Sequence, residues 1–299
     1  MKGRIFRRLA LFGVLAATLI VVPNASVRQF DTALVKIDYA QGVDHPKNII
    51  WVLAMGSDAR PGETITRTRA DAIQLVGINL KTGTGVILGT PRDSWVSIDG
   101  VGSNRVNAAL YYGGPQLMAK TVGQIYGIDV DYALITGFGG FERMVKTIGG
   151  VVVDSDMDFS DDNLAFRYHK GKNYVNGTKA LNFGRMRHYL PRGDFDRSAH
   201  QGELIKAIAR KVKQKQDVPG FFEAGMLSAL TELRTDLNPA ELYRIAQAAI
   251  TVNPAKIKDC VLPGGIGDIG GASVVIPNLT EAKRIGNDVR TDAKLDSGC

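Results

Sequence analysis

Arginine and aspartate recur together in short clusters along the sequence, and this combination suits phosphate chemistry. Arginine binds phosphate through paired hydrogen bonds, and a divalent cation is held by one or two carboxylates together with substrate phosphates. The clusters occupy residues 56–60, 67–71, 91–93, 105–107, 185–188 and 194–197. Any one of them could be ordinary solvated surface, but together they predict a pyrophosphate site.

Two carboxylates are candidate ligands for a metal ion at that site. Asp58 lies in the first cluster and Asp71 ends the second. Mg²⁺ takes oxygen ligands and usually keeps several waters, so two carboxylates completed by diphosphate oxygens are sufficient. We therefore expect Mg²⁺, or Mn²⁺ in its place, at Asp58 and Asp71.

The spacing of Arg185 and Arg187 constrains the backbone between them. Side chains two residues apart point about 200° apart on an α-helix, but they point the same way on an extended segment. If both guanidinium groups reach one ligand, the helix through 179–183 has to stop at Gly184, a natural C-terminal cap. We predict that residues 185–187 are extended.

These clusters need a framework, and the sequence predicts an α/β fold. Short apolar runs bounded by Gly, Pro or Asn are typical of buried strands, and longer stretches with capping signals indicate helices. The expected strands are 48–55, 72–79, 85–90, 256–262 and 272–276. The expected helices are 115–126, 138–148, 196–214, 239–250 and 280–289. Asn238 is the expected N-cap of the fourth helix, with Glu241 as its reciprocal cap. Their alternation predicts a mixed central β-sheet with helices on both faces, in a single domain.

In their order and spacing, the clusters resemble the LytR-CpsA-Psr proteins, which are cell-envelope enzymes with a membrane anchor and an exported catalytic domain. The resemblance covers residues 48–211. The segments that carry it are 56–60, 69–71, 90–93, 105–109, 112–115, 148–151, 180–187, 193–197 and Gln201.

This resemblance implies a reaction and a set of site residues. Members of the family transfer a glycopolymer from a polyprenyl-pyrophosphate carrier to a peptidoglycan hydroxyl as a phosphodiester, with Mg²⁺ at the diphosphate. By position, Asp58 and Asp71 match the metal-site carboxylates. The matching diphosphate-binding arginines are Arg69, Arg92, Arg185, Arg187 and Arg197. Asp71, Arg92 and Asp93 are the expected catalytic residues, and Asp93 either partners a neighbouring arginine or acts as a base.

One position departs from the family pattern. Many members have a further arginine immediately before the glutamine that corresponds to Gln201, whereas this chain has His200. A neutral histidine there would lower affinity for the diphosphate, make binding sensitive to pH, or change nothing if solvent fills the space. The residues alone do not decide among these three outcomes.

A polyprenyl diphosphate joins a long apolar tail to a charged head, so its enzyme needs an apolar tunnel beside a cationic pocket. Apolar residues on the helices after residue 100 could line such a tunnel, or could form ordinary core. These candidates are Leu110, Met118, Met144, Ile148, Phe183 and Ile205.

The N-terminal segment predicts where the chain is placed. Four cations in the first eight residues precede an uninterrupted apolar run over residues 9–22. This run is shorter than the ~20 residues of a spanning helix, so a cleavable signal peptide is one reading. The sequence before Ala25 lacks the small-x-small cleavage pattern, which favours an uncleaved anchor. The cations then keep the N-terminus in the cytoplasm and send the rest across the membrane.

The expected organisation follows from this orientation. Residues 1–25 form a basic tip and a membrane anchor or signal, 26–47 a stalk, and 48–299 an extracytoplasmic catalytic domain with a C-terminal α/β extension. The predicted location is the cell membrane of a bacterium, with a single pass. An oxidising compartment permits a disulfide, so we expect Cys260 and Cys299 to pair.

Composition excludes several classes of protein. The apolar share of 44% and the charged share of 22% indicate a folded globular chain rather than a disordered or polytopic membrane protein. The four N-terminal cations account for +4 of the net charge of +7, so the remaining chain carries only +3. No concentrated basic face or recognition motif follows, so we do not expect nucleic acid as a partner.

Two other functions fit the same residues. A polyprenyl-pyrophosphate hydrolase would use the same site with water in place of the sugar hydroxyl. A membrane-tethered, lipid-binding regulator would need the tail tunnel but no catalytic carboxylate.

Overall fold

The computed structural model describes residues 31–40, 42–44, 48–161, 166–187, 190–221 and 233–299. The predicted anchor at 1–25 lies outside these ranges, so its prediction stays a prediction. Within them, no helix combines the length and the apolar character that a membrane crossing requires.

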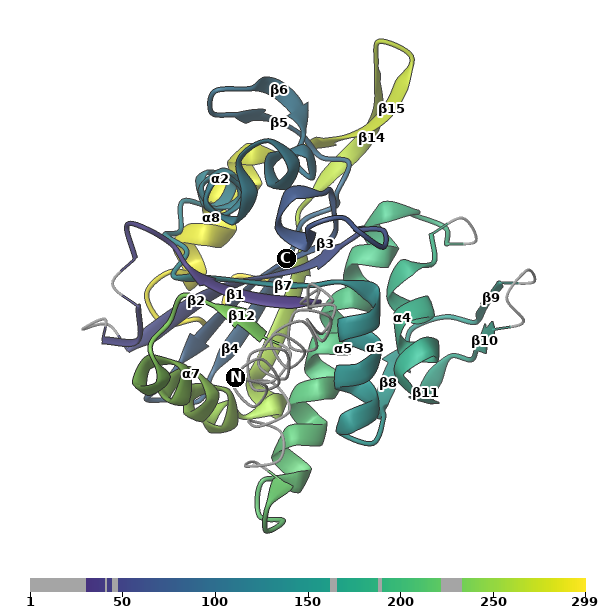
Figure 1. Cartoon of the computed structure of the whole chain (residues 1–299). Helices are drawn as coiled ribbons and strands as arrows, with labels where there is room; N and C mark the ends of the chain where they lie inside the picture. The colour runs from purple at the N-terminus through teal and green to yellow at the C-terminus, as the bar shows by residue number, and fades with distance from the viewer. Residues whose placement is uncertain (1–30, 41, 45–47, 162–165, 188–189, 222–232) are drawn as a thin grey trace, which may run out of the picture.

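The core of the fold is a mixed seven-stranded sheet with the order β12–β1–β7–β2–β3–β4–β13 (Figure 1). The strands are β1 (Thr32–Lys36), β2 (Ile49–Ser57), β3 (Ala70–Asn79), β4 (Gly85–Gly89), β7 (Tyr132–Thr136), β12 (Leu233–Thr235) and β13 (Ile257–Val261). β2 and β4 are both antiparallel to β3, while β7 is parallel to β2 and β13 is parallel to β4. Four strands therefore end at one edge of the sheet, where β3 begins; we call this the carboxyl edge.

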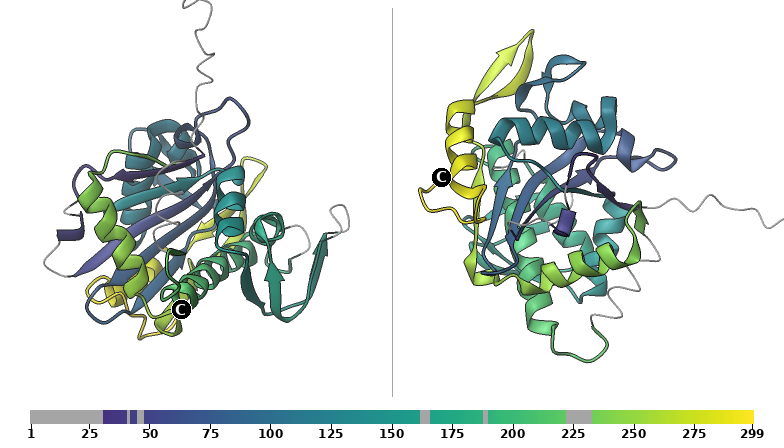
Figure 2. Two further views of the ribbon diagram at one scale, coloured as in Figure 1. Left: turned by 60° about the horizontal axis from the view of Figure 1, so that its bottom comes forward. Right: turned by 90° about the vertical axis from the view of Figure 1, so that its left-hand side faces the viewer.

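Helices cover both faces of this sheet, as predicted (Figures 1 and 2). One face carries α2 (Ala108–Tyr126) and α8 (Leu279–Val289), and the other carries α3 (Phe138–Thr147), α4 (Gly177–Arg185), α5 (Asp194–Lys215) and α7 (Pro239–Thr251). Along β2, Trp51 and Leu53 pack in the core cluster with α2 and α8, whereas Val52 and Ala54 face the second group. Burial on both faces explains why β2 reads as a continuous apolar run.

Four short strand pairs lie outside the central sheet in the described part of the chain. They are β5 (Trp95–Ile98) with β6 (Gly102–Arg105), β8 (Val151–Ser155) with β11 (Gly171–Val175), β9 (Phe159–Asp161) with β10 (Phe166–Tyr168), and β14 (Gly264–Ile269) with β15 (Ala272–Pro277). Three 3₁₀ turns are also described: η1 (Gly42–Asp44), η2 (Ile65–Arg67) and η3 (Pro254–Lys256).

Part of the predicted stalk belongs to the folded domain. Residues 32–36 form β1, which pairs with β7 and β12 inside the sheet, and Ala33 and Leu34 are buried. The stalk prediction is therefore wrong for these residues. A five-residue strand shows little period, and its partner Leu233 lies so far along the chain that no local pattern reveals the pairing.

The helix predicted to start at residue 115 is the second part of a longer, kinked helix. α2 begins at Ala108 and is interrupted at Gly114, whose φ of 67° and ψ of −159° are not helical. Glycine adopts a positive φ without the steric penalty of a side chain, and Pro115 then restarts the helix because its φ is already helical.

The predicted N-cap of α7 is confirmed. Asn238 Oδ1 accepts a hydrogen bond from the Glu241 backbone N–H at 2.9 Å. Glu241 Oε1 accepts from Lys36 Nζ at 2.9 Å and from the Tyr132 hydroxyl at 2.7 Å. The carboxylate thus joins the start of α7 to β1 and β7.

The predicted disulfide is also confirmed. Cys260 on β13 is bonded to Cys299, with a Cα–Cα distance of 5.5 Å and a sequence separation of 39 residues. Because β14 follows β13 directly, the bond fastens the end of the chain to the strand from which the β14–β15 hairpin starts.

Reduction of this disulfide is expected to destabilise the protein. Freeing a loop of this length raises the entropy of the unfolded chain, which lowers the free energy of unfolding by about 4 kcal/mol. The melting temperature should then fall by roughly 8–16 °C in reductant. A variant carrying both Cys260→Ser and Cys299→Ser should melt at the lower temperature with or without reductant. An unchanged melting temperature in reductant would contradict the expectation.

Candidate active site

The Arg and Asp clusters come together at the carboxyl edge of the sheet. Asp58 follows β2, Asp71 is at the start of β3, and Arg92 and Asp93 follow β4. Loops at this edge of an α/β sheet commonly carry binding residues. The Asp58 N–H donates to the Arg69 carbonyl at 3.1 Å, which holds the ends of the first two clusters side by side.

Arg92 is at the centre of the site. Its Nη1 donates to Asp71 Oδ1, and its Nε lies 3.9 Å from Asp93 Oδ2. Burial lowers the pKa of Arg92, but the charges of Asp71 and Asp93 raise it by more, so the guanidinium stays ionised. Arg92 Nε is buried and has no hydrogen-bond partner among the residues that the structure describes. A buried donor without a partner is costly, so this N–H is available to an anionic ligand.

Asp93 pairs with further arginines that come from distant parts of the chain. Its Oδ1 lies 3.5 Å from Arg105 Nε, and its Oδ2 lies 3.4 Å from Arg187 Nη1. Of the two roles considered for Asp93, this geometry favours the charge partner that holds arginines in place.

Asp194 and Arg197 form a buried ion pair at the start of α5. Asp194 also accepts a hydrogen bond from the Asp93 N–H at 3.3 Å. Burial raises the pKa of Asp194 and lowers the pKa of Arg197. Asp194 and Arg105 lie in two of the predicted clusters, but neither was assigned a role at the site. Asp194 could have been identified by its spacing of three residues from Arg197, because residues three apart on a helix are neighbours.

The two predicted metal ligands fit a divalent cation. Burial raises the pKa of Asp58, and the negative charge of Asp71 raises it further, while Arg69 and Arg92 oppose the shift. A cation placed between the two carboxylates would relieve this repulsion. No cluster of three or more His, Cys, Asp or Glu side chains suits a metal in the described ranges, so phosphate and water oxygens would have to complete the shell.

Arg185 differs from its prediction. It is the last residue of α4 and its guanidinium lies 4.1 Å from the centre of the Phe138 ring, while Arg187 follows an extended Met186. The predicted stop at Gly184 is therefore wrong by one residue. A Cβ at Gly184 would lie 2.9 Å from Leu204 Cδ1, so this glycine permits close packing of α4 on α5.

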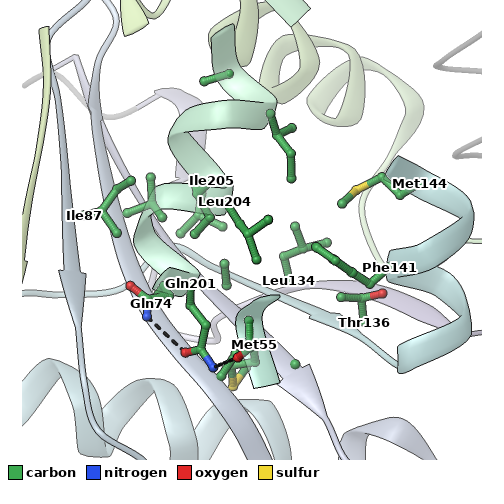
Figure 3. A pocket seen from close by; sticks show the side chains of 18 of the residues that line it. Met55, Gln74, Ile87, Leu134, Thr136, Phe141, Met144, Gln201, Leu204 and Ile205 are labelled. Carbon is green, nitrogen blue, oxygen red and sulfur yellow. Dashed lines mark hydrogen bonds between the residues drawn. The ribbon is translucent and has the colours of Figure 1, made fainter. Parts of the chain in front are cut away.

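An apolar cavity of about 400 Å³ opens beside the charged site (Figure 3). It lies between the face of the sheet that carries Val52 and Ala54 and the helices α3, α4, α5 and α7. Asp71 and Arg185 line one end, and Ile245 on α7 lines the other. The lining between them is almost entirely apolar.

Two of the six proposed tunnel residues line this cavity. Met144 on α3 and Ile205 on α5 are in its wall, as Figure 3 shows. The other four are core residues: Leu110 and Met118 pack between α2 and the sheet, and Ile148 and Phe183 pack with β8 and α5. Sequence hydrophobicity is the same in both settings, so it did not separate them.

His200 lies away from the diphosphate corner. Its ring stacks on Phe159 at 4.7 Å and on Phe183 at 4.5 Å between centroids, and it is 4% exposed. Burial lowers the pKa of His200, although Asp156, Asp196 and Glu203 oppose the shift. It therefore contributes an aromatic ring to the core, where the resemblance suggested a ligand contact.

This buried histidine is expected to make stability depend on pH. Below pH 6.5 an unfolded histidine takes up a proton that the folded His200 does not, so the free energy of unfolding falls as pH decreases from 6.5. The slope reaches about 1.4 kcal/mol per pH unit at most. Urea unfolding at pH 7.5 and 5.5 measures it, and His200→Phe should remove this part of the slope. Equal slopes in both proteins would contradict the assignment.

Comparison with known proteins is consistent with this geometry. TagU of Bacillus subtilis, named polyisoprenyl-teichoic acid–peptidoglycan teichoic acid transferase, is 37% identical over 166 residues, which cover 55% of this chain and 53% of TagU. The chain thus spans about half the length of the curated relatives it matches.

Solved structures share the fold over most of the chain. B. subtilis TagV superposes with a TM-score of 0.70 at 24% identity, covering 83% of this chain and 98% of TagV. The family protein YwtF (TagT), solved with bound octaprenyl pyrophosphate lipid, gives a TM-score of 0.62 at 24% identity, covering 83% of this chain and 91% of that one. The family model for the LytR_cpsA_psr family matches residues 23–291, and the chain therefore belongs to the LytR_cpsA_psr family.

Proposed function

We propose that this protein transfers a glycopolymer from a polyprenyl-pyrophosphate carrier to a hydroxyl of peptidoglycan, leaving a phosphodiester link. One observation carries the proposal: the arginine and aspartate cluster lies at the mouth of an apolar cavity. A cationic site next to an apolar cavity matches an amphiphile with a charged head and a long hydrocarbon tail.

The relatives support this reaction class. The B. subtilis relative is named a transferase that moves teichoic acid from a polyisoprenyl carrier to peptidoglycan. The TagT structure, which has the same fold, holds octaprenyl pyrophosphate. These findings support a polyprenyl-pyrophosphate donor here and leave the identity of the glycopolymer open to experiment.

In the proposed reaction, the acceptor hydroxyl attacks the glycan-linked phosphorus. The bond to the bridging oxygen breaks, polyprenyl phosphate leaves, and the hydroxyl proton passes to a base. Arg92, Arg187 and Arg197 would stabilise the negative charge that grows on the leaving phosphate. Asp71 holds Arg92 in place, Asp93 holds Arg187, and Asp194 holds Arg197. Fixed guanidinium groups stabilise such charge without reorganising.

The remaining predicted residues have distinct roles in this proposal. Arg185 lies at the mouth of the cavity, and its guanidinium packs on the Phe138 ring. In the proposed complex it lies beside the point where the tail of the lipid joins its diphosphate head. Arg69 lies next to Asp58 and limits the repulsion between the carboxylates. Asp58 and Asp71 would hold Mg²⁺. When bound, that ion would neutralise charge on the diphosphate.

We propose the bacterial cell envelope as the location, with residues 9–22 as the membrane anchor. The support is the basic and apolar pattern of the N-terminus together with the lipid carrier that the cavity suits. The disulfide is in keeping with an oxidising compartment.

A reconstituted assay tests the function. The full chain is incubated in vesicles with a polyprenyl-pyrophosphate-linked glycan, a peptidoglycan oligosaccharide and Mg²⁺, and products are identified by mass spectrometry. A glycan–peptidoglycan phosphodiester and polyprenyl monophosphate in equal amounts are expected. Free glycan phosphate alone would show a hydrolase, and bound lipid without turnover would show a lipid-binding regulator.

A further inference from the structure

Gln74 places an amide in a wall that is otherwise apolar. It lies on β3, where Val76 and Ile78 line the same cavity further from the charged end. Its side chain is buried, with 2% exposure. Burying an amide in apolar surroundings is costly unless it is hydrogen-bonded, so its bonds should reveal what the residue does.

The nitrogen of this amide bonds to α5. Gln74 Nε2 donates to the Ser198 carbonyl at 3.0 Å and to Ser198 Oγ at 3.2 Å. It also donates to Gln201 Oε1 at 3.3 Å (Figure 3). A carbonyl can only accept, so the nitrogen and not the oxygen must face it. Gln74 Oε1 is left buried, with no hydrogen-bond partner in the described part of the chain.

Gln201 continues the connection to the charged site. Its Nε2 donates to the Gly184 carbonyl at 2.9 Å and to the Asp71 carbonyl at 3.3 Å. Gly184 is followed directly by Arg185. Two amides in series therefore join the cavity wall to the backbone of Asp71 and to the carbonyl of Gly184, which precedes Arg185.

We propose that Gln74 is a positioning residue that couples the tail cavity to the diphosphate site through Gln201. It lies three residues from Asp71, or about 10 Å along the strand, in the part of the wall that the start of the tail would contact. A tail lying against Gln74 fixes its side chain, and the fixed amide holds Gln201 and with it Asp71 and Arg185. The inference rests on the proposed function.

The first test separates binding from turnover. Gln74→Met keeps the length of the side chain but leaves Gln201 Oε1 without its donor. We expect KM for the lipid-linked glycan to stay within about twofold and kcat to fall roughly 10- to 100-fold, because a small misplacement of charged groups slows the transfer step. Gln124→Met makes the same substitution at an exposed glutamine on α2, which covers the opposite face of the sheet, and should leave kcat within about twofold.

The second test asks whether Gln74 acts through its neighbour. In a double-mutant cycle with Gln201→Met, the two losses in kcat should be strongly non-additive. In labelled wild-type protein, octaprenyl diphosphate should shift the Gln201 side-chain amide signals, and Gln74→Met should abolish this shift while the lipid still binds.

The outcomes distinguish this inference from the function on which it rests. If the wild type transfers glycan and Gln74→Met equals it in kcat, or if the losses add, the positioning role is overturned while the function stands. If the wild type neither binds octaprenyl diphosphate nor transfers glycan, both are overturned. A folded Gln74→Met protein that binds lipid, loses kcat and couples to Gln201 supports the inference.

Discussion

Replacement of Arg92 by alanine is expected to lower kcat/KM for glycan transfer by about 100- to 1000-fold. This is the range for removing one fixed donor that stabilises charge in a transition state. The variant loses the buried Nε, which donates no hydrogen bond to any described residue, and it also leaves Asp71 without its guanidinium. An unpaired carboxylate beside a diphosphate repels it, so the binding of donor and the rate of transfer should both suffer.

Two further variants make this expectation specific. Arg92→Lys keeps the charge but not the planar fork, so its activity should lie between wild type and alanine. Arg234→Ala removes an exposed arginine on β12, at the opposite edge of the sheet from β4, and should leave transfer unchanged. If Arg92→Ala melts like wild type and keeps most of its activity, the site has been assigned to the wrong residues.

Much of the architecture could be predicted because the apolar runs match the elements closely. β2, β3, β4 and β13 each begin and end within about two residues of the predicted strands, since both faces of this sheet are covered and the runs are uninterrupted. β1 and β12 could not be found in this way. They are short and pair across most of the chain, so their existence depends on tertiary contacts.

The site was predictable in its residue types but not in its connections. Four of the site residues lie at the ends of strands that share an edge of the sheet: Asp58, Asp71, Arg92 and Asp93. Arg187 follows α4 and Arg197 lies at the start of α5, and both reach the same edge. Local sequence carries no information on which carboxylate each arginine meets. Arg185 is an example, because its helix runs one residue longer than a Gly stop suggests and its contact is the ring of Phe138.

His200 and Gln74 show the limit most clearly. The residues alone left open whether His200 affects the diphosphate corner, and the helix turns it about 100° from Gln201 and into an aromatic core. Gln74, in contrast, was not singled out in the sequence. It reads as one polar residue in an apolar strand, and only its contacts with Ser198 and Gln201 give it a role.

Filling the cavity with a larger side chain is expected to weaken the binding of long-chain donors roughly 100-fold while sparing short-chain ones. Val52 lines the cavity four residues along β2 from Gly56, or about 13 Å from the charged end. In Val52→Phe the added ring occupies space that the tail would need. Excluding even four methylene-sized groups removes about 3 kcal/mol of apolar burial, which weakens binding roughly 100-fold.

The test compares two donors that differ only in the length of the prenyl chain. The same glycan diphosphate is supplied on a long polyprenyl chain and on a short prenyl chain, and KM is measured for each with wild type, Val52→Phe and the smaller change Val52→Ile. We expect Val52→Phe to raise KM for the long chain alone and Val52→Ile to raise it only slightly, because a single methylene is easily accommodated. Equal losses with both donors would mean that the substitution disturbs the charged site, and no loss with either would mean that the tail lies elsewhere. Only selective loss is consistent with a tail that runs from Asp71 past Val52 toward α7.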